Sequence, residues 1–119
     1  MSPSPLDRLR ALCLALPEAT EKEAWGEPTF RVAGRMFASY ATALNHHGDG
    51  REAVWCPASP GAQAALVESA PDRFFVPPYV GGKGWIGIDL DAVDDDELGF
   101  HLQEAYLTVA PKRLAALLD

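Results

Sequence analysis

The spacing of the apolar residues changes twice along the chain, and this change restricts the fold more than any other feature. From Leu6 to Leu16 and again from Leu98 to Val109, apolar residues recur at helical spacing. Between these stretches lie segments in which apolar and polar residues roughly alternate, as in β-strands with one buried face. Strands that come in groups, without strict alternation with helices, predict the α+β class.

Caps and breakers set the expected helices. Ser4 and Pro5 form a helix start, Pro17 ends that helix, and the polar residues 18–23 are predicted to be a solvated loop. Ser59-Pro60 repeats the same start for a short helix that ends before Pro71. The remaining predicted helices are one with a capping box of Asp94 and Glu97, and a last helical segment from Pro111 to Leu118.

Five strands are predicted from the alternating segments, at residues 29–32, 35–44, 52–56, 74–76 and 85–90. Ala33-Gly34 is the expected two-residue turn between the first two strands. The predicted order is therefore α-β-β-β-α-β-β-α-α. This order indicates a two-layer sandwich in which helices cover one face of a five-stranded antiparallel sheet.

Length and charge limit the possible functions. A chain of 119 residues can bury one core without disulfides or metals, so residues 1–119 are predicted to form a single domain. A formal net charge of -7 disfavours general nucleic-acid binding, because that binding depends on Lys and Arg. No signal peptide is expected from the first residues, which lack its cationic segment and apolar core, and no apolar run approaches the roughly 20 residues that span a bilayer. No membrane association and a cytoplasmic location are expected.

The stretch Pro77–Trp85 is the densest in special residue types, with three glycines and one lysine among prolines and aromatic residues. It differs from a phosphate-binding loop because no Ser or Thr follows Lys83 and a strand follows the stretch, so no helix N-terminus is available. Three interpretations stay open: a stiff connection that delivers Trp85 to the core, a backbone nest for an anion, or a ligand surface of Tyr79, Lys83 and Trp85.

Lys112 and Arg113 extend the list of predicted ligand-binding residues. They occupy the first turn after Pro111, where the helix dipole disfavours positive charge, so they are candidates for binding a partner. The alternative is that they pair with the acidic surface of the chain itself. A joint role with Lys83 requires that folding bring the three cations together.

Metal and nucleophilic sites are not predicted. His46, His47 and Asp49 are of metal-ligand types, but adjacent histidines in an extended loop seldom face one ion and a fourth ligand is lacking. Two cysteines, Cys13 and Cys56, are too few for a disulfide framework, and Cys56 has no base beside it in the sequence. No cofactor is expected.

Three motifs, Trp25–Phe30, Pro77–Gly87 and Ala105–Leu114, resemble those of the MmcQ/YjbR family of small bacterial proteins. The resemblance covers nearly the whole chain. It implies a compact two-layer α+β fold similar to the CyaY-like and secretion-chaperone-like architectures. The family is often labelled DNA-binding on grounds of fold, which does not by itself establish function.

Three functional hypotheses follow. The first is a noncatalytic binding module of undetermined ligand, with nucleic acid as a candidate because of the family resemblance. The second is a protein-interaction or chaperone-like adaptor, suggested by the acidic composition and the similarity to secretion chaperones. The third is a small-molecule enzyme, which requires a pocket that unites Tyr79 and Lys83 with a carboxylate.

Overall fold

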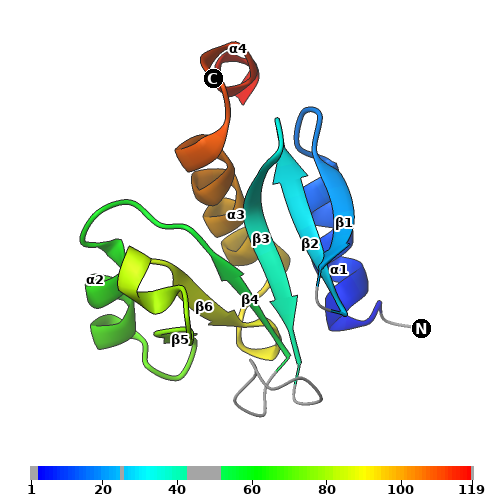
Figure 1. The fold of residues 1–119 in the computed structure, drawn as a ribbon. Coiled ribbons are helices and arrows are strands. Elements are labelled where there is room, and N and C mark those ends of the chain that lie inside the picture. Colours follow the sequence, from blue (N-terminus) through cyan, green and yellow to red (C-terminus); the bar gives the residue numbers. More distant parts are fainter. Residues whose placement is uncertain (1–2, 25, 43–51, 119) are drawn as a thin grey trace.

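The computed structural model describes residues 3–24, 26–42 and 52–118, and within them six antiparallel strands form one sheet (Figure 1). The spatial order of the strands is β1-β2-β3-β4-β6-β5, so β6 lies between β4 and the short edge strand β5. The bounds are Thr20–Ala24 for β1, Glu27–Val32 for β2, Arg35–Ala41 for β3, Ala53–Cys56 for β4, Phe74–Phe75 for β5 and Ile86–Asp89 for β6.

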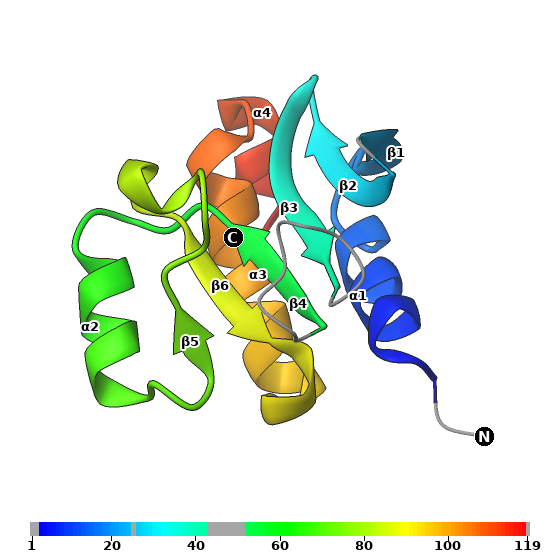
Figure 2. The ribbon, with the colours of Figure 1, turned by 60° about the horizontal axis from the view of Figure 1, so that its bottom comes forward.

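Two helices, α1 (Pro5–Leu14) and α3 (Asp95–Val109), cover one face of the sheet, while α2 (Ala62–Ser69) lies beside β5 (Figures 1 and 2). This arrangement confirms the predicted α+β class with helices and an antiparallel sheet. The further likeness to CyaY stays a prediction. The short helix α4 (Lys112–Ala115) follows α3, and the 3-10 turns are η1 (Gly81–Lys83), η2 (Leu90–Ala92) and η3 (Ala116–Leu118). In the described parts of the chain, no helix has the length and apolar character needed to cross a membrane.

The core lies between the sheet and the two long helices. Helix α3 contributes four fully buried side chains at helical spacing, and α1 contributes Leu9 and Cys13. The four residues of α3 are Leu98, Leu102, Ala105 and Tyr106. Aromatic side chains join the layers, because the rings of Phe37 on β3 and Tyr106 on α3 meet edge to face at 5.5 Å.

The expectation of five strands is wrong, because part of the predicted loop at residues 18–23 belongs to β1. This strand pairs with β2 from Thr20 opposite Arg31 to Ala24 opposite Glu27. Its first four residues are exposed, so no buried face produces the alternation by which strands are recognised. Charged residues on an edge strand also protect it from pairing with other chains, which explains why a strand here is polar.

The turn between β2 and β3 confirms the prediction for Ala33-Gly34. Both residues have positive φ, +50° and +79°, as a type I′ hairpin turn requires. The strand β3 ends at Ala41, and the last two residues of the predicted strand, 43 and 44, lie outside the described residues.

Two of the three predicted helix caps are confirmed. The Ser4 hydroxyl accepts a hydrogen bond from the backbone N–H of Asp7 at 3.1 Å, and the Asp94 carboxylate accepts one from the N–H of Glu97 at 2.8 Å. Each bond satisfies one of the N–H groups that have no partner inside the helix.

The third predicted cap, Ser59, is wrong. Pro60 and Gly61 form a turn in which the Ser59 carbonyl accepts a hydrogen bond from the N–H of Ala62 at 3.0 Å. Gly61 has φ +86° and ψ -16°, values that fit the third position of a type II turn, where glycine follows proline. The turn preference of Pro-Gly therefore delays the start of α2 until Ala62.

Gly87 allows a close contact across the β5–β6 pair. It lies opposite Trp55 on β4 and Phe75 on β5. The Phe75 ring occupies the space in which a Cβ atom of residue 87 would lie. Any larger residue at this position must displace the ring.

We expect Gly87→Ala to lower the free energy of unfolding by about 1–3 kcal/mol, because the added methyl group overpacks the contact with Phe75. Urea denaturation measures this loss. Gly82→Ala is the matched control, since a Cβ at Gly82 meets nothing within 4 Å and its φ is not left-handed, so a change within about 0.5 kcal/mol is expected. Equal losses in the two variants would contradict the packing argument.

Candidate binding surface

Residues 76–85, named the Tyr79 loop from here on, connect β5 to β6 and fold back on themselves. The N–H of Gly81 donates to the Pro77 carbonyl at 3.0 Å, and the N–H of Gly84 donates to the Gly81 carbonyl at 3.0 Å. Gly84 ends η1 with φ +85°, a conformation that favours glycine. The loop is therefore a hydrogen-bonded structure and more than a tight hairpin turn.

A side chain of α2 contributes to fixing the loop to the rest of the protein. The Nε2 amide of Gln63 donates to the carbonyl oxygens of Gly81 at 2.8 Å and of Trp85 at 2.7 Å. Gly81 is the first residue of η1, and Trp85 follows the residue that ends it. The amide therefore holds this segment at both ends. Gln63 was not identified from the sequence, because an isolated glutamine in a short helix carries no pattern.

Tyr79 is held in an unusual backbone conformation at the tip of this loop. Its φ is +67°, in the left-handed region that costs an L-residue about 1–2 kcal/mol. The residue is 73% exposed, and Val76 nearby in the loop is 55% exposed. Strained residues of this kind persist where the surrounding structure fixes them, and they are frequent at ligand sites.

The structure places three of the five predicted site residues on this loop. Tyr79 and Lys83 are exposed, whereas Trp85 is half-buried. Trp85 lies outside the core cluster, which instead contains its neighbour Ile86. The interpretation of the loop as a connection that delivers Trp85 to the core is therefore wrong.

Lys112 and Arg113 lie elsewhere, on α4. Figure 1 shows α4 beyond the upper end of the sheet, whereas η1 of the Tyr79 loop lies beside α2. Arg113 binds Glu18 through two hydrogen bonds of 2.9 and 3.3 Å, and this interaction lowers the pKa of Glu18. The structure thus brings Tyr79, Lys83 and Trp85 together and separates them from Lys112 and Arg113.

Other arginines are also engaged with carboxylates. Arg10 makes a two-pronged ion pair with Glu21, with N–O distances of 2.7 and 3.0 Å. Arg73 Nη1 lies 2.9 and 3.1 Å from the two carboxylate oxygens of Glu97. Positive charge that is neutralised within the protein contributes less to binding phosphates.

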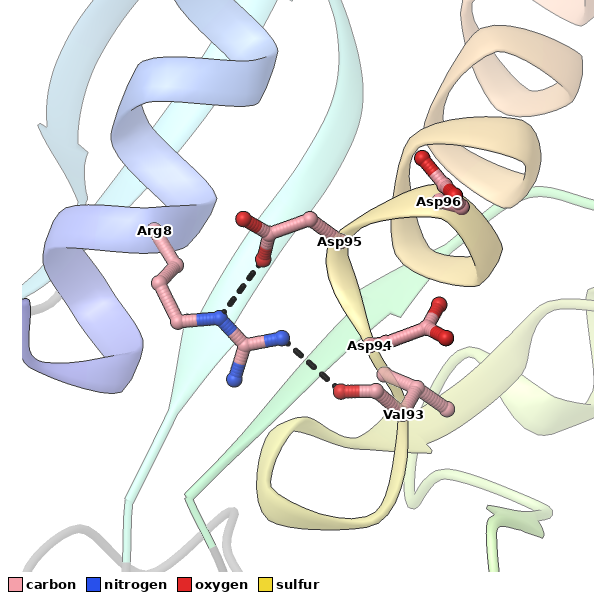
Figure 3. Close-up of a pocket in the computed structure, with 5 residues that line it drawn as sticks. All are labelled: Arg8, Val93, Asp94, Asp95 and Asp96. Carbon is pink, nitrogen blue, oxygen red and sulfur yellow. Dashed lines mark hydrogen bonds and ion pairs between the residues drawn. The ribbon is translucent and has the colours of Figure 1, made fainter.

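An open depression of about 520 Å³ lies between α1 and the start of α3, lined by Arg8, Val93, Asp94, Asp95 and Asp96 (Figure 3). Arg8 donates to the carbonyl oxygens of Leu90 at 2.9 Å and Val93 at 2.8 Å, and to the Asp95 carboxylate at 2.8 Å. Each of the three guanidinium nitrogens donates one of these bonds. Arg8 therefore ties α1 to the segment that leads into α3.

Both cysteine thiols and the Tyr40 hydroxyl have raised pKa values, which favours their protonated forms. Burial raises the pKa of the Cys56 thiol to about 12 and also raises the pKa of the Cys13 thiol. Burial and a 2.8 Å hydrogen bond to Glu52 raise the pKa of the Tyr40 hydroxyl. Thiols of this kind are poor nucleophiles at neutral pH.

Metal-ligand residue types are also scattered in the described parts of the chain, where no group of three or more His, Cys, Asp or Glu could hold an ion. The predicted loop cluster of His46, His47 and Asp49 lies outside the described residues. His101 is packed edge to face against Phe74, with ring centroids 5.1 Å apart, and burial lowers its pKa.

Comparison with known proteins identifies a family and a solved structure of similar fold. The sequence model of the YjbR family matches residues 14–108, a region that contains two of the three motifs in full. The crystal structure of Deinococcus radiodurans protein DR2400, which carries a DUF419 domain, is similar with a TM-score of 0.74 and 23% sequence identity. The likeness covers 97% of this chain and 90% of that chain, and it supports the fold alone. No curated protein matches.

We expect Arg8→Ala to lower the free energy of unfolding by about 2–3 kcal/mol, because the partly buried carbonyls of Leu90 and Val93 lose charged donors. Thermal or urea denaturation measures the effect. Arg10→Ala removes an exposed ion pair from the same helix, so its expected cost is below about 1 kcal/mol. If the two variants are equally stable, Arg8 is not the tie between α1 and α3.

Proposed function

Because the chain belongs to the YjbR family and presents an exposed aromatic side chain on a hydrogen-bonded loop, we propose that it is a noncatalytic binding module that contacts a protein through the Tyr79 loop. The family relationship agrees with the resemblance seen in the sequence motifs. The family relationship does not identify a ligand, so we infer the class of ligand from the chemistry of the surface. A cytoplasmic location and the absence of a catalytic role are parts of this proposal.

The exposure of Tyr79 in a clamped, left-handed conformation is the observation that carries the proposal. An aromatic side chain offers a large contact area, and tyrosine is enriched among the residues that dominate binding energy in protein interfaces. Binding costs less when the contact residue is already fixed before the partner arrives. Gln63 and the hydrogen bonds of η1 provide this fixation.

The composition of the loop surface favours a protein over a nucleic acid. Val76 and Tyr79 provide an apolar and aromatic centre, and Lys83 provides one cation beside it. The centre of a protein interface typically has few charged residues and many aromatic residues. A nucleic-acid surface requires several cations, but Arg73 and Arg113 are paired with carboxylates and the whole chain carries a charge of -7.

A noncatalytic role is favoured by the state of the reactive side chains. Both thiols have raised pKa values, and the Tyr40 hydroxyl donates to Glu52. A site of enzymatic chemistry would instead have groups with pKa values near the working pH. The pocket that the enzyme hypothesis requires would have to unite Tyr79 and Lys83 with a carboxylate, whereas the depression in Figure 3 lies at Arg8 and the start of α3.

Site-specific photo-cross-linking in the cells that make the protein tests the proposal. With a photoreactive phenylalanine analogue at position 79, we expect a discrete cross-linked product that protease digests and nuclease does not. The matched control carries the same analogue at Lys22, an exposed position on the opposite edge strand, and is expected to give no such product. A nuclease-sensitive product, or equal products from both positions, would overturn the proposal.

A DNA titration tests the competing assignment from the family label. We expect the purified protein to show no saturable binding to duplex or single-stranded DNA at low salt, as measured by fluorescence anisotropy. Binding that weakens with salt and is lost in the triple variant Lys83→Ala, Lys112→Ala and Arg113→Ala would instead support the nucleic-acid hypothesis.

A further inference from the structure

Helix α3 exposes a second surface, on the side away from the sheet. Its residues lie at helical spacing along one face, from the first turn of the helix to near its end, and all are exposed. We name them the α3 stripe: Asp96, Phe100, Gln103, Glu104 and Leu107. The opposite side of the helix is buried in the core, so the stripe faces solvent.

Two of the residues in the α3 stripe are apolar. Phe100 is 60% exposed and Leu107 is 37% exposed. The Phe100 ring packs edge to face against His101, with ring centroids 5.2 Å apart and an interplanar angle of 77°. His101 is in turn fixed against the buried Phe74. Phe100 is thus an exposed aromatic residue that is positioned before any partner binds.

Carboxylates of α3 flank Phe100. The sequence from Asp94 to Ala110 contains no Lys or Arg, and burial lowers the pKa of His101. The ion pairs with Arg8 and Arg73 engage Asp95 and Glu97, and leave Asp96 and Glu104 facing solvent. The stripe therefore combines exposed apolar side chains with carboxylates on both sides of Phe100.

From this combination we infer that the α3 stripe docks a basic amphipathic helix of a partner protein. Apolar residues of that helix would contact Phe100 and Leu107, and its Lys or Arg side chains would approach Asp96 and Glu104. A second copy of this chain does not fit, because it would bring the same carboxylates and a net charge of -7 against the stripe. The surface is separate from the Tyr79 loop, so the inference does not rest on the proposed function.

The test uses a labelled synthetic helical peptide with leucine on one face and lysine on the other, titrated with the purified protein and followed by fluorescence anisotropy. We expect saturable binding that Phe100→Ala weakens about tenfold, as for an interface anchor. Leu117→Ala is the matched control, because Leu117 is 65% exposed on η3 and lies outside the stripe. This control is expected to bind the peptide like the unmodified protein.

Two double variants, each lacking two carboxylates, distinguish docking at the α3 stripe from general attraction to an acidic protein. Asp96→Asn with Glu104→Gln should weaken binding and reduce its salt dependence. Glu23→Gln with Glu68→Gln removes the same charge from exposed positions on β1 and α2 and should leave the affinity unchanged. Equal weakening by the two double variants would show diffuse attraction and would overturn the inference.

The remaining outcomes also decide the question. Failure of the peptide to bind, or binding that is insensitive to Phe100→Ala, rules out the α3 stripe as the docking site. Binding that is weakened by Tyr79→Ala and not by Phe100→Ala would assign the peptide to the Tyr79 loop, which refutes this inference and leaves the proposed function standing. Circular dichroism of each variant confirms that the fold is retained.

Discussion

The side-chain amide of Gln63 is the interaction on which the candidate surface depends. Its two hydrogen bonds join α2 to Gly81 and Trp85, one within η1 and one just before β6. Backbone carbonyls that are partly buried need donors, and a loop outside the sheet ladder has few of them. The amide therefore supplies donors to two carbonyls of the loop that connects β5 to β6.

This constraint connects local conformation to the proposed function. A tyrosine in the left-handed region is unfavourable by itself, so the loop needs stabilising contacts to keep it there. The loop also requires glycine at position 81, because a Cβ there would lie 2.5 Å from Cγ1 of Val76. The same contacts that compensate for the strain present Tyr79 to solvent, and a residue presented in this way loses little entropy on binding.

The two proposed surfaces differ in charge and in position. The Tyr79 loop carries one cation beside an exposed aromatic side chain, whereas the α3 stripe carries carboxylates around Phe100. The Tyr79 loop leads into β6 and the α3 stripe lies on α3, and both of these elements contribute buried residues to the core. The two proposals, taken together, agree with the adaptor hypothesis better than with a general nucleic-acid binder.

The features that sequence predicts are those with local physical causes. The caps at Ser4 and Asp94 and the turn at Ala33-Gly34 depend on neighbouring residues, and all three were predicted correctly. The strand β1 was missed because its exposed, charged residues give no alternation. A sequence pattern likewise carries no information on which carboxylate a surface arginine will meet.

For the candidate site, the sequence located the loop and the exposed residues Tyr79 and Lys83, but it did not identify exposed Val76, the partial burial of Trp85 or the contacts that fix the loop. Gln63 meets Gly81 and Trp85 across 18 and 22 residues of chain, and Arg113 meets Glu18 across 95. Contacts of this range depend on the order of the strands in the sheet. That order also explains why Lys83 and Lys112 lie apart.

The central claim is that the Tyr79 loop is ordered before it binds, and backbone ¹⁵N relaxation tests it most directly. We predict order parameters of about 0.85 for the amides of Tyr79 to Gly84, comparable with those of β6, and a fall below about 0.6 in Gln63→Ala. Gln103→Ala, which changes an exposed glutamine of α3, should leave these values unchanged. Low order parameters in the unmodified protein, or no change in Gln63→Ala, would contradict the account.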